Sequence, residues 1–298
     1  MQSYVVGNVT IDTTVVIADF PEPGVSIHGR EAAIGLGGKG CNQAIVMARA
    51  GLKTILVAAV GDDARGATIS KLLADEPLIA DLVVLPDAAS DASLILSARG
   101  ENANITTSAS AEGLTLERAT AAMEAAQPGD LLVLQGNLSD AVTAGLLAFG
   151  KARGMVTAFN PSPLRPSMGE MLASVDVLFL NESETFALTG KTGREAAELL
   201  LARGPEAIVL TLGGAGAMLV TAEGVEAVPP VPCTVVDTTG AGDTFMATAL
   251  SSAALRGVRL DRRAMLDASQ ASALTVSRMG TQAAFPTENE LALILGQS

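Results

Sequence analysis

The chain has 298 residues, which is enough for one large domain or two small ones with a substantial buried core. Apolar residues make up 49% and charged residues 17%, a composition that excludes intrinsic disorder. The net charge of −13 argues against a nucleic-acid partner, and no apolar run is long enough to predict a membrane span. No signal peptide is expected. Because Cys41 and Cys233 do not make a disulfide framework, a cytoplasmic location is expected.

The first third of the chain mixes strand-like and helix-like segments. Apolar runs there predict helices at 40–50 and 64–74 and strands at 4–7, 13–18, 54–60, 93–98 and 104–108. Residues 99–103 join the last two strands, and the polar alternation of the second strand is typical of a hairpin. We interpret residues 8–34 and 90–108 as a small β lid that excludes water during group transfer.

From residue 114 onward, strands and helices alternate regularly. Strands are expected at 130–135, 155–159, 175–180 and 207–212, and helices at 116–126, 141–150, 194–202 and 246–255. Two further helices around a loop at 277–286 end the chain. This alternation indicates an α/β fold with a parallel sheet and helices on both faces. We interpret residues 1–298 as a single domain that carries the lid.

Polar residues follow three of these predicted strands. In open α/β sheets, ligands bind outside the carboxyl ends of the strands, so these residues are candidates for a binding site. They are Gln135-Gly136-Asn137, Asn160-Pro161 and Asn181-Glu182-Ser183-Glu184.

A glycine-rich stretch, Asp237-Thr238-Thr239-Gly240-Ala241-Gly242-Asp243-Thr244-Phe245, opens the helix predicted at 246–255. Gly240 and Gly242 allow a tight turn and a close approach to a ligand. The unpaired amides and positive dipole end of the helix then favour an anion such as a phosphate. A carboxylate beside an anion site has a task if it takes a proton from an attacking hydroxyl, which makes Asp243 a candidate base. The alternative is an ordinary turn in which Asp243 only caps the helix.

A second glycine-rich stretch, Gly35-Leu36-Gly37-Gly38-Lys39-Gly40-Cys41-Asn42-Gln43-Ala44, precedes the helix at 40–50. Lys39 offers a cation, and Asn42 offers both a donor and an acceptor. The stretch is not a Walker A loop, because Gly40 follows Lys39 where that motif needs Ser or Thr. A dinucleotide fingerprint starting at Gly35 is disfavoured, because no buried strand leads into it.

Together, these stretches resemble the signatures of the ribokinase (PfkB) family of carbohydrate kinases, and within it the ribokinases most closely. The resemblance covers essentially the whole chain. It includes Asn160-Pro161-Ser162-Pro163, the Asn-x-x-Glu motif at Asn181 to Glu184, and a nucleotide loop at Thr211-Leu212-Gly213-Gly214-Ala215-Gly216. It implies a ribokinase-like, doubly wound α/β sheet with helices on both faces and a small β-sheet lid. It also implies ATP-dependent phosphorylation of a primary hydroxyl of a small sugar, and a homodimer formed through the lid.

The resemblance implies a role for each matching residue. Asp243 would be the general base, and the amides of Gly240, Ala241 and Gly242 would form the anion hole. The sugar would contact Asp12, Gly37, Gly38, Lys39, Asn42 and Asp243, with Thr10 and Asn137 at two further sugar positions. ATP would contact Thr211, Gly213, Gly216 and Gly242, with Asn181 and Glu184 at the phosphate–Mg²⁺ region. A monovalent cation, K⁺, would be held by the side chain of Asp237 and by carbonyls of Thr239, Thr275, Arg278 and Gly280.

Three departures from the family pattern leave the substrate and the K⁺ dependence open. Thr10 stands where ribokinases carry asparagine, and Asn137 where they carry glutamate, so the pocket has different hydrogen-bonding groups. Ala284 replaces a serine of the cation loop. Ribose or a related pentose is the leading interpretation, with a nucleoside or a keto-sugar acid as alternatives. A nucleoside base needs a ring to stack on, and the lid offers only Phe20. A catalytically silent sugar-binding regulator is the alternative from another class; it would be expected to have lost Asp243 or the glycines.

Overall fold

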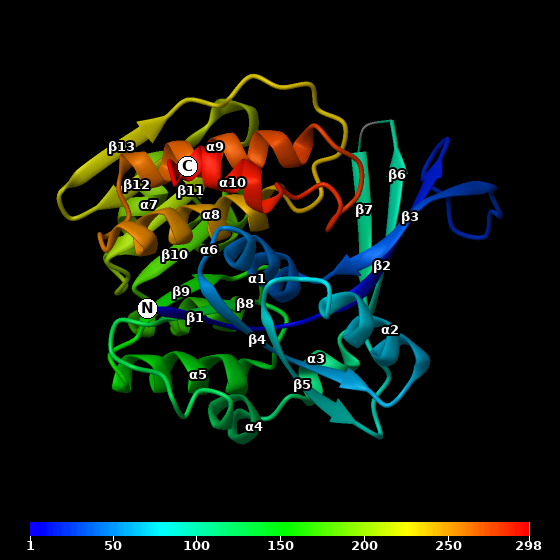
Figure 1. The fold of residues 1–298 in the computed structure, drawn as a ribbon. Helices are drawn as coiled ribbons and strands as arrows, with labels where there is room; N and C mark the ends of the chain where they lie inside the picture. The colour runs from blue at the N-terminus through cyan, green and yellow to red at the C-terminus, as the bar shows by residue number, and fades with distance from the viewer. Residues whose placement is uncertain (100, 298) are drawn as a thin grey trace.

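The computed structural model describes residues 1–99 and 101–297 (Figure 1). Gly100, in the predicted hairpin connection, and Ser298, the last residue of the predicted domain, lie outside the described residues. The larger sheet has the strand order β13-β12-β11-β10-β9-β8-β1-β4-β5. Its strands are β1 (Gln2–Val6), β4 (Lys53–Gly61), β5 (Ile79–Leu85), β8 (Leu131–Gln135), β9 (Val156–Asn160), β10 (Val177–Asn181), β11 (Ala207–Thr211), β12 (Ala217–Thr221) and β13 (Gly224–Val228).

Helices cover both faces of the larger sheet, because its strands are apolar on both sides. On β1, Val5 packs into one buried cluster, whereas Tyr4 and Val6 pack into the other. The Val5 face is covered by α1 (Lys39–Arg49), α2 (Ala64–Leu73), α8 (Ala241–Arg256), α9 (Arg262–Val276) and α10 (Glu288–Leu295). The opposite face is covered by α3 (Ala109–Gly113), α4 (Leu116–Ala121), α5 (Asp140–Ala152), α6 (Glu182–Thr189) and α7 (Gly193–Leu201). The predicted doubly wound α/β fold is therefore confirmed.

The expectation of a wholly parallel sheet is wrong at one edge. Neighbouring strands from β5 to β11 pair in parallel, but β12 pairs antiparallel with both β11 and β13. Thr221 pairs with Gly224, so only Ala222 and Glu223 join β12 to β13. A connection of two residues can join only antiparallel strands, since a parallel pair needs a crossover of a dozen or more residues.

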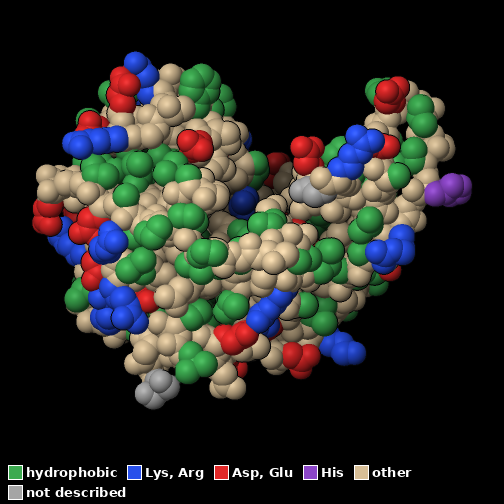
Figure 2. Space-filling model, turned by 90° about the horizontal axis from the view of Figure 1, so that it is seen from above, with side chains coloured by type: hydrophobic (Ala, Val, Ile, Leu, Met, Phe, Trp, Pro, Cys, Tyr) green, Lys and Arg blue, Asp and Glu red, His purple; other side chains and the backbone are tan. Residues whose placement is uncertain are grey.

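A second sheet, with the order β3-β2-β6-β7, lies beside the larger one (Figure 1). Its strands are β2 (Thr10–Ile17), β3 (Gly29–Gly37), β6 (Ala92–Ala98) and β7 (Glu101–Thr106). The predicted hairpin is present as β6 and β7, which pair antiparallel, with β7 earlier in the chain than expected. Because side chains alternate across a strand, Asp12 and Ser93, which pair in register, lie on one face of this sheet. Figure 2 shows a hollow between the main body and this projecting sheet.

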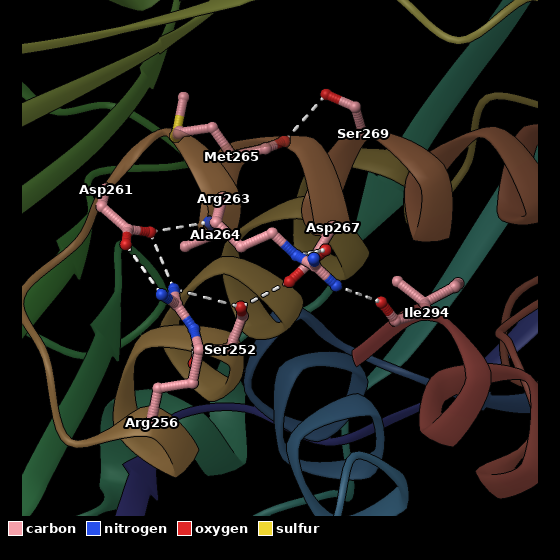
Figure 3. Close-up of polar contacts among 9 residues, drawn as sticks. All are labelled: Ser252, Arg256, Asp261, Arg263, Ala264, Met265, Asp267, Ser269 and Ile294. Carbon is pink, nitrogen blue, oxygen red and sulfur yellow. Dashed lines mark hydrogen bonds and ion pairs between the residues drawn. The ribbon is translucent and has the colours of Figure 1, made fainter. Parts of the chain in front are cut away.

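The far end of α8 is fixed by a polar network that joins it to α9 (Figure 3). The buried carboxylate of Asp267 accepts a hydrogen bond from Ser252 Oγ at 2.6 Å and another from Arg263 Nε at 2.7 Å. Arg256 donates to both oxygens of Asp261, at 2.7 Å each, and Asp261 also caps α9 by accepting from the Ala264 amide. This network holds in place the helix that begins at the glycine-rich stretch near residue 240.

We expect Asp267→Ala to lower the free energy of unfolding by about 1–3 kcal/mol, because the buried Ser252 hydroxyl loses its acceptor. The matched control is Glu198→Ala, which removes an exposed partner of Arg194 at the same i,i+4 spacing. That control should cost about 0.5 kcal/mol or less. Urea denaturation of both variants measures the difference, and equal losses would contradict the role given to Asp267.

Candidate active site

A cavity of about 690 Å³ lies between the carboxyl ends of the larger sheet and the inner face of the second sheet, where Figure 2 shows the hollow. Polar side chains from both sheets and from the first turns of α1 and α8 line it. Those at the end of the larger sheet are Asn137, which follows β8, and Asn160, Asn181 and Thr211, which end β9, β10 and β11. Those from the second sheet are Asp12, Ser93, Asn102, Asn104 and Thr106, and the helices add Lys39, Asn42 and Asp243.

The first turn of α8 faces this cavity with its backbone uncovered. Gly240 has a φ of 76°, and an added Cβ would lie 2.6 Å from Cε1 of the buried Phe285. Gly242 lines the cavity, and a Cβ built on it meets no described heavy atom within 4 Å. The Ala241 amide donates to the Thr238 carbonyl at 3.3 Å. The first amides of a helix have no partner within the helix itself, so this turn presents the N–H groups of Gly240 and Gly242, both of which line the cavity, and a positive field suited to an anion.

Asp243 lies on the same turn and is 6% exposed. Its Oδ2 accepts a hydrogen bond from Asn42 Nδ2 at 2.9 Å, and its Oδ1 accepts one from Gln43 Nε2 at 3.0 Å. These donors belong to α1, so the two glycine-rich stretches, about 200 residues apart in the chain, meet at this carboxylate. The geometry places an acceptor for a proton next to an anion site.

Asp12 lies across the cavity on β2 and is also 6% exposed. Thr10 Oγ1 donates to Asp12 Oδ1 at 2.6 Å, and a Cβ on Gly37 would lie 2.0 Å from the same carboxylate. Thr10 and Gly37 are not part of the cavity lining among the described residues; they hold and accommodate Asp12 instead. Burial raises the pKa of the Asp12 carboxyl, and hydrogen bonds from Thr10 and Ser93 oppose that effect.

We expect Asp12→Asn to raise the melting temperature at neutral pH while weakening the sugar binding that the family resemblance implies for Asp12. The folded-state pKa of Asp12 lies above its unfolded value, so its contribution to stability is fully present below the unfolded pKa and is lost as the pH rises through the folded pKa. Asparagine avoids burying a charge but replaces one of the two accepting oxygens with an NH₂ donor, which cannot accept from a sugar hydroxyl. Thermal unfolding and steady-state kinetics measure both effects, and a KM rise of about tenfold is expected for the sugar alone. An unchanged KM would exclude contact with the sugar.

Two buried amide oxygens at the cavity have no hydrogen-bond partner among the described residues. They are Oδ1 of Asn42 and Oδ1 of Asn137. Because an unsatisfied buried polar atom is costly, both oxygens are suited to a ligand with hydroxyl donors. Gly38, which has a φ of 88°, and Lys39 complete the wall at the start of α1.

The second sheet turns a row of polar side chains toward the cavity that was not predicted from the sequence. Asn102, Asn104 and Thr106 on β7 and Ser93 on β6 line it. The polar alternation of the predicted hairpin was the signal for this row. Asn8, which lies between β1 and β2, was missed as well.

The other end of the cavity carries the Asn-x-x-Glu motif at the start of α6. Asn181 Oδ1 accepts from the Glu184 amide at 2.8 Å, and Glu184 Oε2 accepts from the Asn181 amide at 3.0 Å. This capping box fixes both side chains beside the end of β10. Thr211 lines the cavity at the end of β11. Gly213 and Gly216 follow in a tight turn but are not part of the lining among the described residues.

Of the residues expected to hold a monovalent cation, Asp237, Thr239 and Gly280 are joined by hydrogen bonds, and the Asp237 amide donates to the carbonyl of Val276, the neighbour of Thr275, at 3.2 Å. The buried carboxylate of Asp237 accepts a hydrogen bond from the Thr239 amide at 2.9 Å and another from the Gly280 amide at 3.1 Å. Thr239 and Gly280 therefore both lie against this carboxylate. Thr275 is buried on α9, and its hydroxyl lies 2.9 Å from that of Thr244. The side chain of Arg278 pairs with Glu290.

Across residues 1–99 and 101–297, no cluster of three or more His, Cys, Asp or Glu side chains is placed to hold a metal ion. Within the same residues, no helix has the length and apolar character needed to cross a membrane.

A helix N-terminus with open glycine backbone, an adjacent carboxylate and a polar cavity at the carboxyl ends of an α/β sheet are features that suit phosphoryl transfer to a polyhydroxy compound. Comparison with known proteins gives the family. Residues 2–288 match the description "pfkB family carbohydrate kinase". The chain is 32% identical to mouse ribokinase over 303 residues, covering 98% of this chain and 94% of that protein. It therefore belongs to the pfkB family of carbohydrate kinases, which are ATP-dependent sugar kinases, as its motifs predicted.

Solved structures agree on the fold. The structure of ribokinase from Giardia lamblia matches with a TM-score of 0.89 at 23% identity, covering 100% of this chain and 99% of that one. The structure of Arabidopsis thaliana ribokinase complexed with ribose and ATP matches with a TM-score of 0.85 at 24% identity, with the same coverage.

Proposed function

We propose that this enzyme transfers the γ-phosphoryl group of ATP to a primary hydroxyl of ribose or a closely related pentose. The observation that carries the proposal is the meeting of Asp243, the open first turn of α8 and the buried carboxylate of Asp12 in one cavity. Support for ribose comes from the likeness to mouse ribokinase and from the Arabidopsis ribokinase, which was solved with ribose and ATP.

The proposed chemistry follows from the positions of these groups. Asp243 takes the proton of the sugar hydroxyl as its oxygen forms a bond to the γ-phosphorus, and the bond from that phosphorus to the β-phosphate oxygen breaks to release ADP. The amides of Gly240, Ala241 and Gly242 face the charge that develops on the transferred group. Asp12 and Asn42 hold the sugar so that its hydroxyl points at Asp243.

Asn181 and Glu184 would hold the magnesium ion that accompanies ATP, mainly through water and phosphate oxygens. The residues fit this role, because Mg²⁺ keeps much of its hydration shell and needs one or two carboxylates rather than a complete protein cage. Glu184 supplies one carboxylate at the cavity wall, and the capping box holds it there. Bound at that position, the ion would neutralise charge on the phosphates.

We further propose K⁺ beside the loop at Asp237, with carbonyls of Thr239, Thr275, Arg278 and Gly280 as further ligands. The buried carboxylate of Asp237 fits a cation, although three N–H donors already face it. Activation by K⁺ is expected to be modest, since Ala284 offers no side-chain oxygen.

The second sheet is the proposed lid of a single domain, and its outer face is the proposed homodimer contact. Asn102 of β7 donates to Asp237 Oδ1 and Thr239 Oγ1, which connects this sheet to the loop before α8.

On the outer face, Ile34, Leu94 and Ile105 align across β3, β6 and β7 and are 60%, 39% and 62% exposed. Covering this apolar row favours a dimer. Light scattering measures the mass, and Ile105→Lys should give monomers. The proposed location is the cytoplasm, where ATP is available.

The test of the substrate is an ADP-release assay with pentoses, hexoses, nucleosides and sugar acids, with Mg²⁺ and with or without K⁺. Turnover confined to ribose and similar pentoses is the expected result. Preference for nucleosides or keto-sugar acids would replace the proposed substrate and keep the kinase chemistry. Tight sugar binding without turnover would favour the silent regulator instead.

A further inference from the structure

Behind Asp243, two buried glutamines form a chain of amide groups that reaches the middle of the larger sheet. Gln43 on α1 donates to Asp243 Oδ1, and Gln135 at the end of β8 donates from Nε2 to Gln43 Oε1 at 2.7 Å. Gln43 is 1% exposed and Gln135 is 0% exposed. Neither side chain belongs to the cavity lining among the described residues, so neither is placed to touch a substrate.

The charge of Asp243 sets the direction of the whole chain. An ionised carboxylate only accepts hydrogen bonds, so Gln43 must turn its NH₂ group toward Asp243. Its carbonyl then faces Gln135, which must turn its own NH₂ group toward Gln43. A flip of either amide would bring two acceptors or two donors face to face.

The backbone is packed closely against Gln135 and against the first turn of α1. A Cβ on Gly7 would lie 2.0 Å from Gln135 Oε1 and 3.0 Å from the Cα of Gly40. A Cβ on Gly40 would lie 2.9 Å from the backbone nitrogen of Asn8. The first turn of α1 therefore lies directly against the end of β1, and this close approach lets Gln43 reach both Gln135 and Asp243.

We infer that Gln43 and Gln135 are positioning residues that fix the plane of the Asp243 carboxylate and direct its Oδ2 to the acceptor hydroxyl. Asn42, the partner of Oδ2, lines the cavity, whereas Gln43, the partner of Oδ1, does not, so Oδ2 is the oxygen on the cavity side. The inference rests on the proposed function, in which Asp243 is the base. A carboxylate free to rotate would lose alignment with the hydroxyl, and a misplacement of about 1 Å can cost a hundredfold in rate.

The decisive comparison is Gln135→Glu with Gln135→Met. Glutamate has nearly the shape of glutamine, but its ionised form cannot donate to Gln43. The Gln43 amide would instead rotate to donate its NH₂ group to the new carboxylate, and its carbonyl would then face Asp243. Methionine donates nothing, yet it leaves Gln43 free to keep its bond to Asp243. A role in packing alone predicts that glutamate is tolerated better than methionine, whereas the amide chain predicts the reverse.

The expected readout is kcat from ADP release between about pH 6 and 9, with the most active pentose. Gln135→Met should lose about tenfold with the shape of the pH profile unchanged. Gln135→Glu should gain a new alkaline limb, losing about a hundredfold as the introduced carboxyl group ionises and recovering as that group takes up a proton and donates again. KM for ATP should stay unchanged in both. The other charged groups that line the cavity, Asp12, Lys39 and Glu184, are the same in every variant.

Gln127→Glu, the same change at an exposed position, is the matched control and should leave kcat unchanged. If Gln135→Glu fails to fold, Gln43→Met carries the test, because it removes the donor to Asp243 and should lower kcat about tenfold with KM for ATP unchanged. A wild-type profile for Gln135→Glu, or a larger loss in the methionine variant at every pH, would overturn the inference. Asp243→Asn separates the role of Asp243 as base from the positioning role of the glutamines. Activity retained in Asp243→Asn overturns the proposed base. Activity lost in Asp243→Asn but unchanged in the glutamine variants overturns only the positioning role.

Discussion

Asp243→Asn is expected to lower kcat by about a thousandfold, because asparagine keeps the shape of the side chain but cannot take the proton of the acceptor hydroxyl. KM for ATP should change little, since the proposed phosphate contacts come from the backbone of the α8 turn and not from this side chain. The measurement is ADP release under saturating sugar and ATP, together with ATP binding by calorimetry.

The control for this variant is Asp267→Asn, which changes another buried aspartate that lies on α9 and is held by Ser252 and Arg263. It should keep its activity even if it loses stability. A kcat for Asp243→Asn within about tenfold of wild type would show that another group accepts the proton.

Gly240→Ala is expected to lower kcat/KM by about a hundredfold, the cost of losing one well-placed anion-hole donor. Two effects combine at this position. Alanine at a φ of 76° is strained by about 1–2 kcal/mol, and its Cβ would lie 2.6 Å from the ring of Phe285, which is buried and cannot move away freely. The turn must therefore shift, and the amides move away from the phosphate.

Gly257→Ala is the control that separates the effect of backbone strain at a positive φ from the effect of moving the α8 turn. Gly257 ends the same helix with a φ of 66°, and a Cβ there meets no described heavy atom within 4 Å. This variant should lose about 1 kcal/mol of stability and keep its kcat/KM. Equal values of kcat/KM for Gly240→Ala and Gly257→Ala would contradict the proposed role of Gly240 in the anion hole.

The parts of the site that could be read from the sequence are those in which neighbouring residues already define the geometry. Glycines followed by a helix predict an anion site, and polar residues after a buried strand predict a ligand at the sheet edge. The spacing of Asn181 and Glu184, which predicts a ligand motif, is also that of a capping box and marks the start of α6.

What the sequence could not show depends on contacts between distant segments. The bond from Gln135 to Gln43 joins residues 92 apart, and nothing local to either marks a partner. Strand β5 was not predicted, although Leu82 to Leu85 form a short apolar run; it lies at the edge of the sheet, and its residues are only partly buried or exposed. The strands β12 and β13 were missed because the expected alternation of strands and helices leaves no place for a two-residue hairpin.

The cavity has two walls that come from different sheets, and this division has an evolutionary consequence. Asn102, Asn104 and Thr106 belong to one strand of the second sheet, whereas Asn181 and Thr211 end strands of the larger one. Because Asp12, one of the proposed sugar ligands, lies on the same sheet as β7, exchanges along β7 would change which alcohol the cavity accepts, while the proposed ATP residues at the ends of β10 and β11 stay unchanged. A duplicated gene could therefore evolve a new substrate specificity while its residues for phosphoryl transfer stay unchanged.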